Sequence, residues 1–139
     1  MFSTENLVFA LTMLEAIEKV FIYSDEFLSA EDLFEANDQL NFNGIQLLLL
    51  TIGEDSKKLS PEIYESYPEI PWKQIATFRN RIAHGYRGVD PFIVYSIIQD
   101  YLGELKLALI SIIKNIDYNE RDLKLILSSN FYRHLSYLI

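Results

Sequence analysis

The sequence "PFIVYSIIQDYLGELKLALISIIKN", residues 91–115, decides the fold class of this chain. Its apolar residues recur at steps of three or four, at Ile93, Ile97, Tyr101, Leu105, Leu109 and Ile112. This period is typical of an amphipathic α-helix, so we expect one helix of about two dozen residues, interrupted only at Gly103. Asp90 and Pro91 mark its start.

Helical periodicity covers most of the remaining chain. We expect helices over residues 5–23, 43–58, 72–83 and 120–128, and short helical segments that begin at Ser29 and at Pro61. The segment 43–58 is apolar around most of its circumference, which places it at the centre of the protein. No segment has the two-residue period of a strand. The sequence predicts an all-α protein, an up-and-down bundle of four to six helices.

Two helix ends carry specific local predictions. Ser3 or Thr4 precedes the first helix and can cap its free N–H groups. Gly85 follows the helix at 72–83, where a glycine in the left-handed conformation commonly ends a helix.

Composition indicates a single folded domain over residues 1–139. Within it we distinguish the segment 71–90, which is set apart by its charge and its motif, and a C-terminal helical extension at 117–139. Half of the 139 residues are hydrophobic, and only five are glycine and four proline. Cysteine is absent, which excludes disulfides and thiolate sites, and two distant histidines favour neither a metal site nor a cofactor. The N-terminus lacks a basic start, and the apolar runs are too short to span a membrane. We therefore expect a cytoplasmic protein.

The charges are unevenly distributed along the chain. The net charge is −8, and residues 1–70 hold fourteen acidic and three basic side chains. Between residues 71 and 89 there is no acidic residue, but there are four basic ones: Lys73, Arg79, Arg81 and Arg87. Since phosphate responds mainly to charges within about 10 Å, this segment can form an anion site on an acidic protein.

The stretch "RNRIAHGY", residues 79–86, holds the residue types that cleave RNA without a metal. A histidine such as His84 can take the proton of a 2′-hydroxyl or protonate the leaving oxygen, and an arginine can stabilise the phosphoryl charge. Asn80 and His84 share one helix face, whereas Arg79 is rotated by about 140° from His84. A second protomer could bring the two together. From the residues alone, His84 can equally be an ordinary helix end, and Tyr86 a packed ring.

Several landmarks resemble one known family. Arg79, His84 and Tyr86 match the Arg-x4-His-x-Tyr motif of HEPN-domain ribonucleases. The surrounding sequence resembles the HepT branch of that superfamily, from about Gly44 to Asp100. Its landmarks occur in the same order: Ile-Gly-Glu at 52–54, Pro-Trp at 71–72, Arg-Asn at 79–80, His-Gly-Tyr at 84–86 and Val-Asp at 89–90.

The resemblance implies an all-α homodimer that is the toxin of a type II toxin–antitoxin pair. It implies an RNA endonuclease that works without a metal, with Arg79 and His84 as catalytic residues and Asn80 in the same site. The implied partner is a minimal nucleotidyltransferase antitoxin, which transfers AMP from ATP to Tyr86. Two other hypotheses stay open: a noncatalytic HEPN module that binds a nucleotide or a nucleotidyltransferase, and a purely structural helical dimer.

The roles of other residues near the motif also stay open. Gly53 is expected to permit close helix packing, and Glu54 to be a buried partner of Arg79 or Arg81. Trp72 is interpreted as a core anchor rather than a platform for RNA bases, and His134 as a packing or surface residue. Lys73, Arg81 and Arg87 either lengthen the RNA path or are simply solvated.

Overall fold

A computed structural model describes residues 1–139, and it is helical throughout. Its α-helices are α1 (Asn6–Ser24), α2 (Ala30–Glu35), α3 (Leu40–Ser56), α4 (Pro61–Ser66), α5 (Trp72–Gly85), α6 (Pro91–Asp100), α7 (Leu102–Lys114) and α8 (Glu120–Leu127). The extended pairing is limited to an isolated bridge between Phe2 and Ile116. The all-α prediction is confirmed. The helices outnumber the expected four to six because residues 91–115 form two of them and because α2, α4 and α8 are short.

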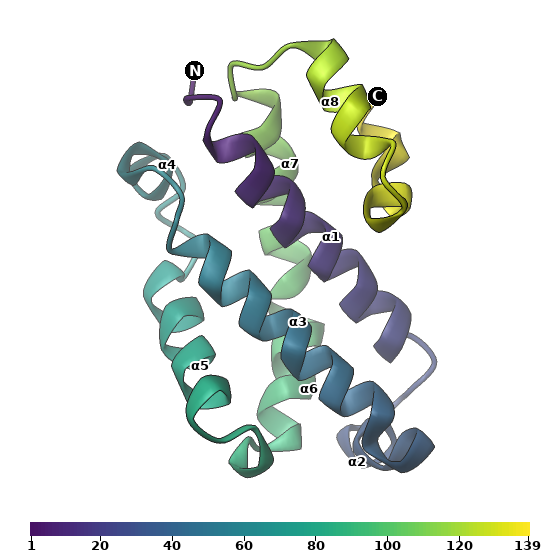
Figure 1. The fold of residues 1–139 in the computed structure, drawn as a ribbon. Helices are drawn as coiled ribbons and strands as arrows, with labels where there is room; N and C mark the ends of the chain where they lie inside the picture. The colour runs from purple at the N-terminus through teal and green to yellow at the C-terminus, as the bar shows by residue number, and fades with distance from the viewer.

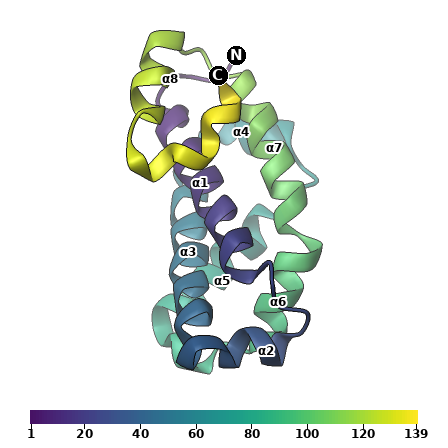
Figure 2. The same ribbon diagram turned by 90° about the vertical axis from the view of Figure 1, so that its right-hand side faces the viewer.

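The long helices run alternately up and down (Figure 1). Helix α3 lies between α1 and α5, and α7 packs on another side of α1 (Figures 1 and 2). The central position of α3, predicted from its apolar circumference, is shared with α1. Among the largest fully buried side chains are Leu14 and Ile17 of α1, Ile45 of α3, and Leu109 and Ile112 of α7. One continuous core therefore joins these three helices.

The stretch 91–115 is broken at Tyr101, not at Gly103 as expected. Tyr101 has φ −124° and ψ −34°, between α6 and α7, whereas Gly103 lies inside α7. Before the break the buried residues are Val94 and Ile98, each one residue along from the predicted Ile93 and Ile97. After it, Leu105, Leu109 and Ile112 are buried as predicted. Because this run is almost continuously apolar, a helix with 3.6 residues per turn could bury either of two adjacent faces. Packing against the neighbouring helices selects one of them.

The helix ends follow some predictions and depart from others. Ser29 caps α2, since its Oγ accepts a hydrogen bond from the Asp32 N–H at 3.1 Å. Neither Ser3 nor Thr4 caps α1 with its side chain, because the Thr4 hydroxyl donates to the distant Asp117 carbonyl instead. Gly85 is not left-handed: its φ is 179°, an extended angle that any residue adopts, and the chain continues into a short 3₁₀ turn, η2 (Tyr86–Gly88).

The C-terminal segment folds back onto the bundle. Helix α8 is followed by the 3₁₀ segment η3 (Asn130–Leu138), which lies against α1 (Figure 2). Leu123, Leu127 and Leu135 join the common core, and the Tyr137 hydroxyl donates to Glu18 of α1 at 3.1 Å. No helix is both long and apolar enough to cross a membrane.

Candidate active site

Helix α5 carries the motif and is held along α3 by an unusually close contact. Of its residues only Ile82 is buried. A Cβ atom at Gly53 of α3 would lie 2.4 Å from the Cβ of Arg79 and 3.2 Å from the Ile75 carbonyl oxygen. A side chain at this position would therefore push the two helices apart. The expectation that Gly53 permits close packing is confirmed, and the contact occurs at the motif arginine itself.

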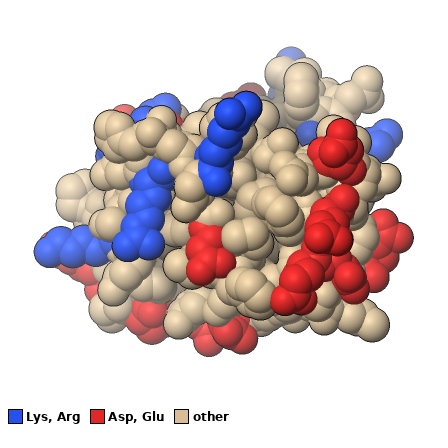
Figure 3. All heavy atoms as spheres, turned by 90° about the horizontal axis from the view of Figure 1, so that it is seen from below, with Lys and Arg blue, Asp and Glu red and all other residues tan.

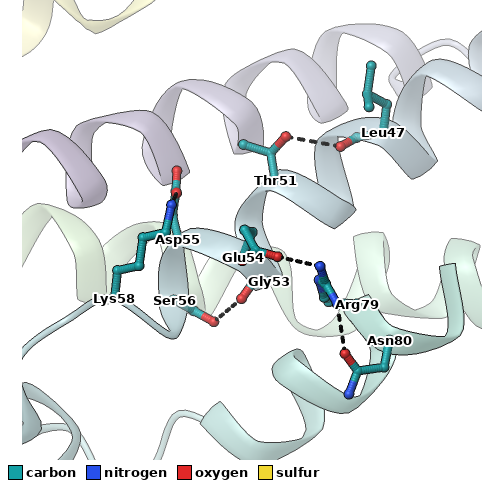
Figure 4. Close-up of polar contacts among 9 residues, drawn as sticks. All are labelled: Leu47, Thr51, Gly53, Glu54, Asp55, Ser56, Lys58, Arg79 and Asn80. Atoms are coloured by element: carbon teal, nitrogen blue, oxygen red, sulfur yellow. Dashed lines mark hydrogen bonds and ion pairs between the residues drawn. The ribbon is translucent and has the colours of Figure 1, made fainter. Parts of the chain in front are cut away.

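Arg79 is held by two polar neighbours (Figure 4). Its Nη2 lies 2.7 Å from Oε2 of Glu54, and its Nη1 donates to the Asn80 side-chain oxygen at 3.0 Å. The predicted pairing of Glu54 with a motif arginine is confirmed for Arg79. Glu54 is not buried as expected, since 40% of its side chain is exposed at the edge between the helices. The guanidinium is oriented by this arrangement and remains within reach of solvent.

His84 lies at the opposite end of α5 from Trp72, beside an open cavity of about 430 Å³. The cavity is lined by Phe78, Arg81, His84, Gly85, Gly88, Val89, Asp90 and Ile93. His84 and Arg81 are both exposed, so an imidazole and a guanidinium face the same solvent-filled space. Asp90 also caps α6, because its Oδ1 accepts a hydrogen bond from the Phe92 N–H at 2.9 Å. The cavity thus combines a proton carrier, a cation and an apolar wall.

Tyr86 and Arg87 line a different cavity, together with residues of α2 and α3. Tyr86 is 48% exposed, and its hydroxyl is not bonded to any backbone group, so the interpretation as a packed ring is wrong. Within one chain, then, Arg79 pairs with Glu54, His84 lines the cavity with Arg81, and Tyr86 lines a different cavity. The structure does not gather the three motif residues around one cavity.

The other basic residues of the acid-free segment are accessible. Lys73, Arg81 and Arg87 are exposed, and none of them forms an ion pair within the chain. Viewed from the end of the bundle where α5 finishes, several basic side chains gather in the left half with a few acidic ones among them, and a larger acidic group lies at the right (Figure 3). Lys73 stands eleven residues before His84, which is about 16 Å along a helix. The positive surface is therefore local, as the sequence indicated.

The interpretations of Trp72 and His134 from the sequence can be compared with the structure. Trp72 packs edge-on against Tyr64, with ring centroids 5.3 Å apart, and its Nε1 donates to the Tyr67 carbonyl at 3.0 Å. This agrees with an anchoring role. His134 is half-buried in η3, far along the chain from the motif. No group of three or more His, Cys, Asp or Glu side chains is placed to hold a metal ion.

Sequence reasoning missed several residues that surround the motif. Phe78 and Ile93 form the apolar wall beside His84, and Gln46 of α3 lines the cavity of Tyr86. Gln46 is only 2% exposed. The sequence does contain a signal for Gln46, because it is a polar residue inside the apolar run "GIQLLLL". When such a helix is buried, the amide of the glutamine is buried too, which is uncommon for this residue type.

Comparisons with known proteins identify the family. The family model described as "Ribonuclease HepT-like" matches residues 13–112. The chain belongs to the HepT-like ribonuclease family. The matched region runs from α1 into α7 and contains every motif residue, whereas α8 and η3 lie outside it.

Individual relatives agree with this assignment. The chain is 31% identical over 99 residues to "Putative RNase MJ1216" of Methanocaldococcus jannaschii, covering 68% of this chain and 82% of the relative. It is 33% identical over 92 residues to "Probable ribonuclease HepT" of Thermococcus cleftensis, covering 66% and 81%. No solved structure matches the chain.

Proposed function

We propose that this HepT-like protein is an RNA endonuclease that acts as a homodimer and needs no metal ion. The observation that carries the proposal is that His84 and Arg81 line the same open cavity at the end of the motif helix, in a chain of the HepT-like family. An acidic protein with a small basic surface suits contact with a short stretch of RNA rather than a long one.

The proposed reaction uses the RNA's own nucleophile. The 2′-oxygen attacks the adjacent phosphorus, the bond from phosphorus to the 5′-oxygen breaks, and the products are a 2′,3′-cyclic phosphate and a 5′-hydroxyl. His84 accepts the 2′-hydroxyl proton or protonates the leaving 5′-oxygen. Arg79, oriented by Glu54 and Asn80, stabilises the charge on the phosphoryl oxygens.

Dimerisation is proposed because one chain leaves the site incomplete and leaves an apolar surface open beside it. A groove of about 420 Å³ runs between α5 and the α6–α7 segment, and its walls include Ile75, Phe78, Ile97 and Tyr101. Phe78 lines both this groove and the cavity of His84. A second copy seated on the groove would cover exposed apolar area and bring its own motif segment next to His84.

The proposed biological role is that of a toxin in a type II toxin–antitoxin pair, neutralised by a nucleotidyltransferase. In that step the Tyr86 hydroxyl oxygen attacks the α-phosphorus of ATP, pyrophosphate leaves, and the hydroxyl proton passes to solvent. The exposure of Tyr86 supports this role, because an enzyme can reach its hydroxyl. The added phosphodiester charge lies next to Arg87, and the AMP group obstructs the RNA surface.

The catalytic proposal is tested by cleavage of labelled RNA in the presence of a chelator. His84→Ala and Arg79→Ala should each abolish cleavage while the dimer mass, measured by light scattering, stays unchanged. His134→Ala and Arg121→Ala are the matched controls, since they remove the same side chains elsewhere. Parent-like cleavage by His84→Ala or Arg79→Ala would overturn the assignment of these residues.

The regulatory proposal is tested separately by intact mass. Incubation with the cognate nucleotidyltransferase and ATP should add mass in steps of AMP, and Tyr86→Phe should lose this addition. Tyr23→Phe, another exposed tyrosine, should keep it. An unchanged mass of the parent would rule out this means of control.

A noncatalytic, nucleotide-binding module is the second candidate, and one observation favours it. Arg79 is already paired with Glu54, so its charge is partly neutralised before any RNA arrives. If the parent protein binds nucleotides but never cleaves RNA, with or without added divalent metal, this second candidate replaces the first.

A further inference from the structure

A buried amide without partners lies beside Tyr86. Gln46 occupies the second turn of α3 and is 2% exposed, and neither its Oε1 nor its Nε2 has a hydrogen-bond partner in the chain. Buried polar side chains are almost always hydrogen-bonded, and a primary amide offers two donors and one acceptor. No group of the chain pairs with these atoms, and Gln46 lines a cavity, so a rotation of its side chain would offer them to a ligand there.

The cavity at Gln46 has the dimensions and the walls of a small ligand site. Its volume is about 320 Å³, and it is lined by Phe34, Gln39, Phe42, Asn43, Gln46, Tyr86 and Arg87. The Phe34 and Phe42 rings meet edge-on, with centroids 5.1 Å apart and an interplanar angle of 73°. The walls therefore offer an aromatic surface, three amides and one guanidinium, contributed by three separate segments of the chain.

The backbone at the mouth of the cavity is also unusual. Asn37, Asp38 and Gln39 have φ angles of 51°, 58° and 70°, so three consecutive residues other than glycine are left-handed just before α3. Gln39, the residue just before α3, lines the cavity together with Asn43 and Gln46 of that helix. Backbone of this kind concentrates at ligand sites.

The chemistry of the walls selects one class of ligand. A glutamine amide pairs in a bidentate manner with the N6 and N7 atoms of adenine. Aromatic rings pack against a nucleobase, and an arginine guanidinium binds phosphate. A ligand that uses all three groups has a flat base with neighbouring donors and acceptors, and a phosphate a short distance away.

We propose that this cavity binds an adenine nucleotide, with the base against Gln46 and the phosphate at Arg87, and that the occupant is the AMP group on Tyr86. The second part rests on the proposed function. Since Tyr86 is itself a wall of the cavity, an AMP group on its hydroxyl starts at the site that would receive it. Docking of the base would keep the modification on the protein surface and withdraw Arg87 from RNA.

The nucleotide site is tested with the unmodified full-length protein and free AMP, by titration calorimetry, with UMP and inorganic phosphate as comparison ligands. AMP should bind more tightly than UMP or phosphate, and Gln46→Met should weaken AMP binding by about tenfold. Gln99→Met, which changes an exposed glutamine, should bind AMP like the parent. Equal binding of AMP by Gln46→Met and the parent, or no saturable binding at all, overturns the site.

A second pair of variants keeps the test valid if Gln46→Met unfolds. Arg87→Gln changes an exposed side chain, and Arg121→Gln is its control on α8. The first should weaken AMP binding and the second should not. Unchanged AMP affinity in Arg87→Gln also contradicts the proposal.

Whether the nucleotide in the cavity is the AMP on Tyr86 or part of a bound RNA is decided with the AMP-modified protein. If the AMP on Tyr86 fills the cavity, the modified protein should no longer bind free AMP. Retained AMP binding by the modified protein, together with competition by a short adenosine-containing RNA, would assign the cavity to the RNA and overturn the AMP assignment. Neither measurement requires RNA cleavage, so this site can fail while the ribonuclease proposal holds, and the reverse.

Discussion

Helices α1 and α5 flank α3 and are both long, but they use their residues in opposite ways. Helix α1 buries eleven of its 19 residues, whereas α5 buries one of 14. Helix α1 is therefore held by deeply buried apolar area, and α5 by Ile82 and by partly buried side chains packed against the core along α3. The difference teaches that the stability of the bundle and its chemistry are carried by separate helices, and that the motif helix α5 joins the buried helix α3 at Gly53.

The largest expected effect on stability comes from truncating a core side chain of α1. Leu14→Ala removes a fully buried side chain and should lower the free energy of unfolding by about 2–5 kcal/mol, through lost burial and a residual cavity. Urea unfolding measures this. Leu107→Ala, at a leucine that is 68% exposed, is the control and should change stability by less than about 0.5 kcal/mol. Equal effects of the two would mean that α1 does not carry the core.

The close contact between α3 and α5 is tested by Gly53→Ala. The new methyl group meets the Cβ of Arg79, so α5 has to shift, and we expect a loss of about 1–3 kcal/mol in unfolding free energy together with reduced cleavage. Gly103→Ala meets no atom within 4 Å and replaces a glycine inside α7, which should stabilise the protein by up to about 1 kcal/mol.

Gly85→Ala extends the same test to the end of α5. Its Cβ would also meet nothing within 4 Å, and its φ of 179° suits any residue. It should therefore cost much less stability than Gly53→Ala. A larger loss at Gly85 than at Gly53 would contradict the close contact described between α3 and α5.

The orientation of Arg79 is tested by Glu54→Gln. The guanidinium loses its ion pair, so cleavage should fall roughly 10- to 100-fold, whereas this partly exposed pair contributes at most about 1 kcal/mol to stability. Glu54→Asp should restore part of the activity, and Glu65→Gln, at an exposed acid of α4, should change nothing. Full activity in Glu54→Gln would show that Arg79 needs no partner.

The smallest effect is expected at the C-terminal segment, at Tyr137→Phe. The hydroxyl donates one hydrogen bond to Glu18, so its loss should cost about 1 kcal/mol or less and leave cleavage unchanged. Tyr137 is half-exposed, and the partial burial of its hydroxyl together with the nearby Glu18 raises its pKa.

The raised pKa of Tyr137 also gives the sign of a pH effect. The folded protein keeps a proton that the unfolded chain releases near pH 10, so the stabilisation is present below about pH 10 and is lost above it. Stability measured against pH should fall more steeply above this point in the parent than in Tyr137→Phe. Parallel curves would contradict the contact.

Much of this protein could be predicted from local pattern. The helical class, the approximate bounds of α1, α3, α5 and α8, and the caps at Ser29 and Asp90 follow from periodicity and from the chemistry of a few side chains. The pairing of Glu54 with a motif arginine also came from the sequence, since an acid beside a small residue on a buried helix needs a basic partner.

Other features could not be predicted in this way. The break at Tyr101 and the choice of buried face in α6 depend on where α1 and α2 stand, because a run rich in isoleucine and leucine offers more than one apolar face. The extended φ of Gly85 depends on how the chain must turn to reach α6, and not on the glycine itself.

By itself, the sequence determined the kind of molecule: an all-α chain of the HepT-like family with one positive, acid-free segment that carries its reactive side chains. These properties are local, because helix period, capping and charge depend on residues a few positions apart. Only the tertiary structure decided that Arg79, His84 and Tyr86 face three different surroundings, and that Gln46 lies unpaired beside Tyr86. Such arrangements depend on the relative positions of whole helices, which result from packing across the core and are not encoded in any single stretch.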